Sequence, residues 1–124
     1  EVLAARFGVS ARARFETGVL GESALPEASA YYLYNPFGEN LFDHDDYLDA
    51  DVELSRARHA RDIAHVIALL HAAPIGTHLV TYNGFGGAVP RSFEQVAVDR
   101  ALPNVLRMWR KTRRDEDVAR AIVI

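Results

Sequence analysis

At 124 residues, of which 49% are hydrophobic, the chain is long enough for one domain with a core, and its composition is neither that of a disordered nor that of a fibrous protein. A net charge of -3 argues against a nucleic-acid partner. The lack of cysteine excludes disulfides, thiolate metal sites and a cysteine nucleophile. Without a secretory leader or an apolar run of the roughly 20 residues that span a bilayer, we expect a single domain over residues 1–124, with no membrane partner and a cytoplasmic location.

The first third of the chain predicts a helix end and two strands. Residues 2–7 are followed by Gly8, a pattern typical of a helix that a left-handed glycine closes. Because a chain seldom begins inside a helix, we expect that further sequence once preceded Glu1. Residues 11–17 alternate between polar and apolar side chains, which predicts a first strand, and residues 30–34 predict a second.

The middle of the chain predicts a long helix followed by a strand. An acidic stretch at 43–52 reads as a surface loop that leads into this helix. From about 53 to 73, apolar residues recur at intervals of three and four, and Pro74 and Gly76 end the pattern. Residues 77–82 then predict a short apolar strand.

The last third of the chain predicts one more helix and two strands. The hydroxyl of Ser92 can cap a helix over 92–101. Segments 105–112 and 118–124 then predict an antiparallel hairpin, joined by the charged turn 113–117.

Strand 30–34 ends abruptly in the sequence Asn35-Pro36-Phe37-Gly38, which makes this the first candidate site. Proline has no N–H, so Pro36 must break the strand ladder. Ligands of open α/β sheets bind beyond the carboxyl ends of strands, so we expect Asn35 and Phe37 to face a crevice. A turn that merely ends the strand is the alternative interpretation.

A second strand end carries a similar pattern. Strand 77–82 finishes in Tyr82-Asn83, and the loop 83–87 is rich in glycine. Backbone N–H groups of such a loop can approach an anion, but the lysine of a phosphate-binding loop is missing. A mobile loop over a cleft fits the sequence better.

Metal binding has weaker support. The run Asp43-His44-Asp45-Asp46 contains ligand types that divalent metals use, but carboxylates adjacent in sequence rarely converge on one ion. Four further histidines lack the four-residue spacing of helical zinc ligands: His59, His65, His71 and His78. We expect no metal, and a metal-dependent hydrolase built on His44 is the weakest alternative.

The order of these elements resembles the C-terminal half of class I S-adenosylmethionine-dependent methyltransferases. In that family the fourth strand ends in a motif such as Asn-Pro-Pro-Phe, Asp-Pro-Pro-Tyr or a looser Asn-x-Phe, which presents the acceptor to the methyl donor. The stretch from Tyr32 to Phe37 resembles this motif, and Pro74-Ile75-Gly76 resembles the entry to the fifth strand. The resemblance implies an α/β fold: a partial Rossmann-like sheet with flanking helices and a C-terminal antiparallel hairpin.

The resemblance also implies a function, which is methyl transfer from S-adenosylmethionine to a small-molecule or protein acceptor. The family's Gly-x-Gly loop and the acid that holds the donor ribose are not in this chain, so an N-terminal portion is expected to supply most of the donor site. A non-catalytic binding or assembly module that kept the sheet is the alternative. The implied site residues are Asn35, Pro36 and Phe37 as the catalytic motif, Tyr34, Gly38, Tyr82, Asn83 and Phe85 around the acceptor, and Thr17, Gly18 and Val19 near the donor.

Overall fold

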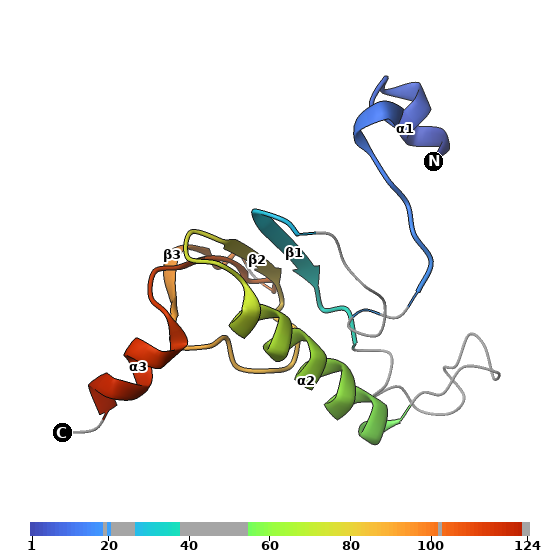
Figure 1. The fold of residues 1–124 in the computed structure, drawn as a ribbon. Helices are drawn as coiled ribbons and strands as arrows, with labels where there is room; N and C mark the ends of the chain where they lie inside the picture. The colour runs from blue at the N-terminus through green and yellow to red at the C-terminus, as the bar shows by residue number, and fades with distance from the viewer. Residues whose placement is uncertain (19, 21–26, 38–54, 102, 123–124) are drawn as a thin grey trace.

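The computed structural model describes residues 1–18, 20, 27–37, 55–101 and 103–122. Its elements in chain order are α1 (Val2–Arg6), the short 3-10 helix η1 (Ser10–Arg12), β1 (Ala30–Tyr34), α2 (Arg56–Ala72), β2 (His78–Tyr82), β3 (Phe93–Asp99), β4 (Leu106–Lys111) and α3 (Asp115–Ile122) (Figure 1).

The strands form one mixed four-stranded sheet in the order β1-β2-β4-β3. Strands β1 and β2 are parallel and in register from Ala30 opposite His78 to Tyr34 opposite Tyr82, so both end at the same edge of the sheet. Strand β4 runs antiparallel to β2 and also pairs with β3 in a hairpin, which places it between them. The parallel pair joined through a helix makes the fold an α/β architecture.

Helix α2 lies against one face of this sheet (Figure 1). It begins because the Ser55 side chain accepts a hydrogen bond from the N–H of Arg58 at 3.1 Å. Within the helix, buried Asp62 forms an ion pair with Arg58 one turn earlier, at 3.6 Å. The helix ends at Ala72, where Ala73 takes an extended conformation and Pro74 follows.

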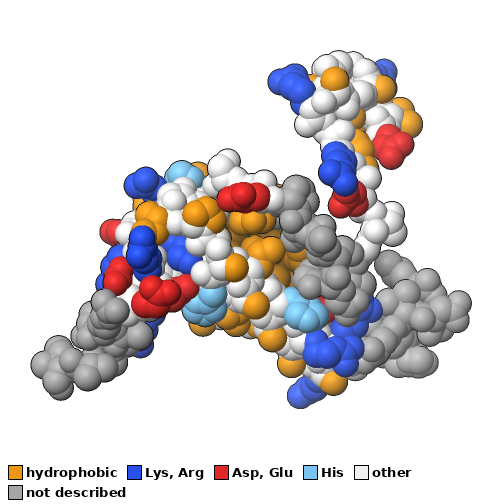
Figure 2. Space-filling view, viewed as in Figure 1, with side chains coloured by type: hydrophobic (Ala, Val, Ile, Leu, Met, Phe, Trp, Pro, Cys, Tyr) orange, Lys and Arg blue, Asp and Glu red, His pale blue; other side chains and the backbone are white. Residues whose placement is uncertain are grey.

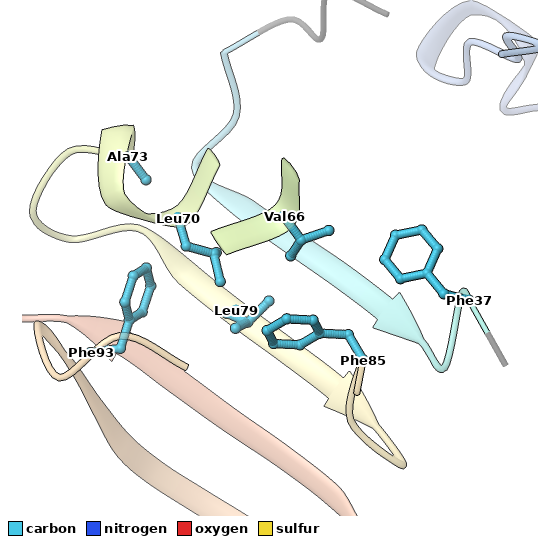
Figure 3. Close-up of a cluster of buried hydrophobic side chains, with 7 residues drawn as sticks. All are labelled: Phe37, Val66, Leu70, Ala73, Leu79, Phe85 and Phe93. Atoms are coloured by element: carbon cyan, nitrogen blue, oxygen red, sulfur yellow. The ribbon is translucent and has the colours of Figure 1, made fainter. Parts of the chain in front are cut away.

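The hydrophobic core fills the space between α2 and the sheet (Figure 3). Helix α2 contributes every third or fourth residue, as its apolar spacing predicts, and strand β2 contributes Leu79. Three phenylalanines from three different segments complete the cluster. Its members are Phe37, Val66, Leu70, Ala73, Leu79, Phe85 and Phe93.

The opposite face of the sheet is exposed. Tyr31 and Leu33 pack toward the core, so the alternation of a strand directs Tyr32 and Tyr34 to the other face, where they are 60% and 64% exposed. Met108 of β4 is also exposed there. Parallel strands are ordinarily covered on both faces. In the part of the chain that the structure describes, this pair is covered on one.

Several sequence predictions are confirmed. The strand at 30–34 has the predicted limits, the strand at 77–82 is β2, and the long helix is α2, which starts three residues later than expected. Gly8 follows α1 with φ of 68°, the left-handed conformation that the sequence suggests. Segment 105–112 contains β4.

The predicted strand at 11–17 is wrong. Residues Ser10–Arg12 form η1, and residues 13–17 belong to no strand. A strand needs a hydrogen-bonded neighbour, and the sheet order leaves this segment unpaired. The alternation instead places Arg14 beside Glu16 as an exposed ion pair.

The predicted helix at 92–101 is also wrong, because Phe93–Asp99 form strand β3. Valines at 96 and 98 favour an extended chain, and pairing with β4 satisfies the backbone groups of this edge strand that face β4. A register shift between Gln95 and Ala97 hides the strand's alternation in the sequence.

The predicted final strand at 118–124 is replaced by helix α3, Asp115–Ile122. Its first turn holds Asp115, Glu116 and Asp117, whose charges favour the positive end of a helix. The antiparallel hairpin therefore exists, but β3 and β4 form it rather than the two segments we expected.

In the described ranges, no helix is both long enough and apolar enough to cross a membrane.

Candidate functional site

Two Tyr-Asn pairs meet where β1 and β2 end. Tyr34 lies opposite Tyr82 in the parallel register, and each is followed by an asparagine. The two tyrosine rings stack with centroids 4.8 Å apart and planes 10° from parallel. This brings Tyr34, Asn35, Tyr82 and Asn83 together at the carboxyl edge of the parallel strands, which is the edge at which α/β proteins bind ligands.

Both asparagines turn the chain with a positive φ. The φ angles are 35° at Asn35 and 58° at Asn83, a region in which asparagine is several times more common than most other residues. The N–H of Asn35 donates to the carbonyl of Gly84 at 3.2 Å, so the turn after β1 is held to the loop after β2. The sequence signal, a polar amide directly after an apolar strand, therefore has a conformational reason at both positions.

The two side-chain amides have different surroundings. Asn83 Nδ2 donates to Asn104 Oδ1 at 3.1 Å, and Asn83 Oδ1 accepts from the N–H of Val105 at 3.0 Å. These bonds hold the entry of β4 against the end of β2. Asn35 is exposed, and its amide makes no hydrogen bond to any described residue. Of the two, the Asn35 amide is available to a ligand.

The two phenylalanines of the predicted site lie in the hydrophobic core. Phe37 is 5% exposed and Phe85 is 1% exposed, and both belong to the hydrophobic core (Figure 3). Pro36 is half-buried between Asn35 and Phe37. The core thereby anchors each turn through its phenylalanine.

The glycine-rich loop after β2 packs onto helix α2. A Cβ added at Gly87 would lie 2.6 Å from Ile63 Cγ2 and 2.7 Å from Phe85 Cε2, so a side chain there would force a shift. At Gly86, with φ of 90°, the added Cβ would lie 3.2 Å from His59 Nε2. Glycine at these positions thus allows the close approach of the loop to α2.

The predicted donor-side residues are not joined to this edge. Thr17 and Gly18 are exposed, and no hydrogen bond or ion pair links them to the strand ends in the described part of the chain. Val19 and Gly38 lie outside the described residues. So does the acidic run from Asp43 to Asp46 that contains His44. No group of three or more His, Asp or Glu side chains that could hold a metal ion occurs among the residues that are described.

A charged cluster that sequence analysis missed lies at the other end of α2. Lys111 is 3% exposed, and its Nζ donates to the carbonyls of Leu70 and His71 and to Asp115 Oδ2, at 3.1, 2.7 and 3.3 Å. His71 Nδ1 lies 3.1 Å from the same carboxylate oxygen. Figure 2 shows acidic and basic side chains gathered in this part of the molecule, near α3. The spacing of Lys111 and Asp115 is visible in the sequence, but their contact with α2 depends on tertiary structure.

This cluster perturbs the ionisation of Asp115. Burial raises the pKa of its carboxyl group, but the nearby polar groups of Ser92, His71 and Lys111 and the charge of Lys111 outweigh burial, so the pKa lies below its ordinary value of 3.8. The ammonium also meets the negative end of the α2 dipole. The cluster therefore stabilises the junction of α2, β4 and α3, away from the Tyr-Asn edge.

A scan against protein-family models and searches of curated proteins and of solved structures found no match to this chain.

Proposed function

We propose that this chain forms the acceptor-binding side of an S-adenosylmethionine-dependent methyltransferase. The observation that carries the proposal is the Asn35 amide, exposed and free of partners among the described residues at the carboxyl edge of two parallel strands. A parallel strand pair with a long helix between its strands, followed by a hairpin, supports it, because these are the elements that the resemblance to class I enzymes implies.

The Asn35 side-chain amide can bind a methyl acceptor through hydrogen bonds. Its oxygen can accept a hydrogen bond from an acceptor amine or hydroxyl, and its nitrogen can donate one. Methyl transfer gains much of its rate from alignment of the acceptor lone pair with the methyl carbon. The exposed ring of Tyr34, held by its stack on Tyr82, offers an apolar wall beside the amide.

The described residues do not fit the methyl donor. Thr17 and Gly18 have no carboxylate, and no strand precedes them to direct a loop toward the Tyr-Asn edge. We therefore assign the donor site to a further part of the protein. In the described part of the chain no strand pairs with the outer edge of β1, so additional strands would join the sheet there, and helices would cover the exposed face with Tyr32 and Met108.

Binding of the methyl donor tests whether the donor site lies outside this chain. In calorimetric titration, the 124-residue chain should bind S-adenosylmethionine with a dissociation constant no tighter than about 1 mM, equivalent to about -4 kcal/mol. The protein as the cell makes it should bind far more tightly. A low-micromolar constant for the 124-residue chain would place the donor site here and contradict the division. The absence of binding to the natural protein would refute methyl transfer.

A pair of glycine variants tests the role of Asn35. Asn35→Gly keeps the positive φ but removes the amide, whereas Asn83→Gly removes an amide that has partners of its own. Made in the protein as the cell produces it, and assayed with methyl-labelled donor and small-molecule or protein fractions of the source cells as acceptors, Asn35→Gly should reduce transfer by roughly ten- to a thousandfold. Its unfolding free energy should change by about 1 kcal/mol or less. Undiminished transfer by Asn35→Gly would return Asn35 to the role of a turn residue.

A binding or assembly module is the second candidate. Burial of Phe37 and Phe85 favours it, because both rings anchor turns in the core and neither is exposed at the Tyr-Asn edge. The same titration separates the two functions, since such a module binds no methyl donor in any form of the protein.

A further inference from the structure

A cavity of about 300 Å³ lies beside the end of β2, on the α2 side of the sheet. Thr81 of β2 and Arg107 and Trp109 of β4 line it from the sheet, and Phe85 and Val89 line it from the loop. Thr81 pairs with Arg107 in the antiparallel register, so their side chains share this face. The volume is at the lower end of the range for small-molecule pockets.

Arg107 is the charged residue of the cavity wall. Its Nη1 donates to Gln95 Oε1 at 2.8 Å, and it has no carboxylate partner in the described part of the chain. A guanidinium has five N–H donors and stays charged at physiological pH. The bond to Gln95 orients the group and leaves the edge formed by Nη2 and Nε free, which is the geometry that matches a carboxylate in two parallel hydrogen bonds.

The rest of the wall lacks acidic groups and is largely apolar. Phe85 and Val89 provide apolar surface, and Trp109 adds the indole ring, whose buried Nε1 has no hydrogen-bond partner. An isolated cation beside apolar surface favours a ligand with one negative group and an apolar body over a highly charged anion.

We propose that this cavity binds a small carboxylic acid, with its carboxylate on Arg107 and its apolar part against Phe85, Val89 and Trp109. Binding at this site does not depend on methyl transfer. It also uses none of the residues assigned to the acceptor, apart from Phe85, which is held in the core.

The chain has its own reporter, because Trp109 is its one tryptophan and lines the cavity. Phenylacetate is the probe, and phenylacetamide is its neutral counterpart of the same shape. Phenylacetate should change the tryptophan fluorescence of the whole chain in a saturable way. Phenylacetamide should bind at least about tenfold more weakly, since it cannot form an ion pair with the Arg107 guanidinium.

Two arginine variants locate the binding. Arg107→Gln should weaken phenylacetate binding by about tenfold or more. Arg110→Gln, the matched control, changes an exposed arginine of the same strand on the opposite face and should bind as the unaltered chain does. Equal binding by Arg107→Gln and the unaltered chain would overturn the proposal, as would equal affinity for acid and amide.

Competition by phosphate and an unfolded Arg107→Gln variant are two further outcomes that test the carboxylic acid proposal. If inorganic phosphate competes as well as phenylacetate does, the cavity is a general anion site and the carboxylic acid assignment is wrong. If circular dichroism shows that Arg107→Gln does not fold, the indole N–H signal of Trp109 is followed by NMR in the unaltered chain. A saturable shift that needs about tenfold less phenylacetate than phenylacetamide supports the proposal. Equal concentrations of the two compounds at half-saturation, or no shift with phenylacetate, refute it.

Discussion

Replacement of Lys111 by methionine tests whether the buried ammonium holds the end of helix α2. Methionine keeps an unbranched side chain that can pack near the Phe93 ring, over which the ammonium lies at 5.7 Å, but it removes all three hydrogen bonds of Nζ. The carbonyls of Leu70 and His71 then lose a charged donor, and Asp115 loses its cation.

The expected loss of unfolding free energy depends on which hydrogen bonds the former partners of Lys111 keep. Hydrogen bonds to charged groups contribute about 1.5–3 kcal/mol each, but removal of a buried charge also removes its desolvation cost. The Leu70 carbonyl keeps a bond from the N–H of Ala73, and His71 lines an open cavity of about 360 Å³ that water can enter. We therefore expect a net loss of about 2–3 kcal/mol, or roughly 8–12 °C in melting temperature for a chain of this size.

Thermal and urea unfolding followed by circular dichroism measure this loss. Arg110→Met is the matched control, because the neighbouring residue is exposed and its replacement should change stability by about 0.5 kcal/mol or less. If Lys111→Met melts within about 1 °C of the Arg110→Met variant, the hydrogen bonds to α2 add no net stability and the reasoning fails.

Three further outcomes are expected. Ionised Asp115 stabilises the fold at pH values above its ordinary pKa of 3.8, and this contribution is lost as pH falls through its lowered pKa in the folded chain. The difference in unfolding free energy between the unaltered chain and Asp115→Asn should therefore shrink in acid. A difference that does not change with pH between about 2 and 6 would contradict this. Gly87→Ala should lower stability by about 1–3 kcal/mol, because the new methyl group overlaps the core, whereas Ala88→Ser should be close to neutral in the same urea titration. Asn83→Ala should cost about 1–3 kcal/mol through its lost bonds to the entry of β4 and the strain of alanine at φ of 58°, and unchanged stability would show that those bonds contribute nothing.

Local patterns predicted the elements that carry a signal of their own. The run from Ala30 to Tyr34 is rich in strand-forming aromatics and stops at a proline, so its limits could be read directly. Helix α2 repeats its apolar residues at helical spacing and ends before Pro74. The two Tyr-Asn strand ends are equally visible. Their meeting at one edge follows once the strands are parallel.

Tertiary pairing decided the segments whose local signal was ambiguous. Residues 93–99 follow Ser92, which can cap a helix, yet they form β3 because β4 offers a backbone ladder. Residues 11–17 alternate as a strand should, but no neighbour pairs with them in the described structure. Side-chain periodicity reports which face a residue would occupy, whereas a strand exists only where another strand completes its hydrogen bonds.

The same division holds for the site. The strand pattern and the turn chemistry that place Asn35 and Asn83 after strands are both local, so these positions could be predicted. Tertiary structure alone ties Asn83 to Asn104, leaves the Asn35 amide without a partner among the described residues, and brings Phe37 and Phe85 into the core. It alone brought Arg107 beside Thr81 and Lys111 to the end of α2, because strand register, which depends on contacts between distant residues, sets which side chains share a face.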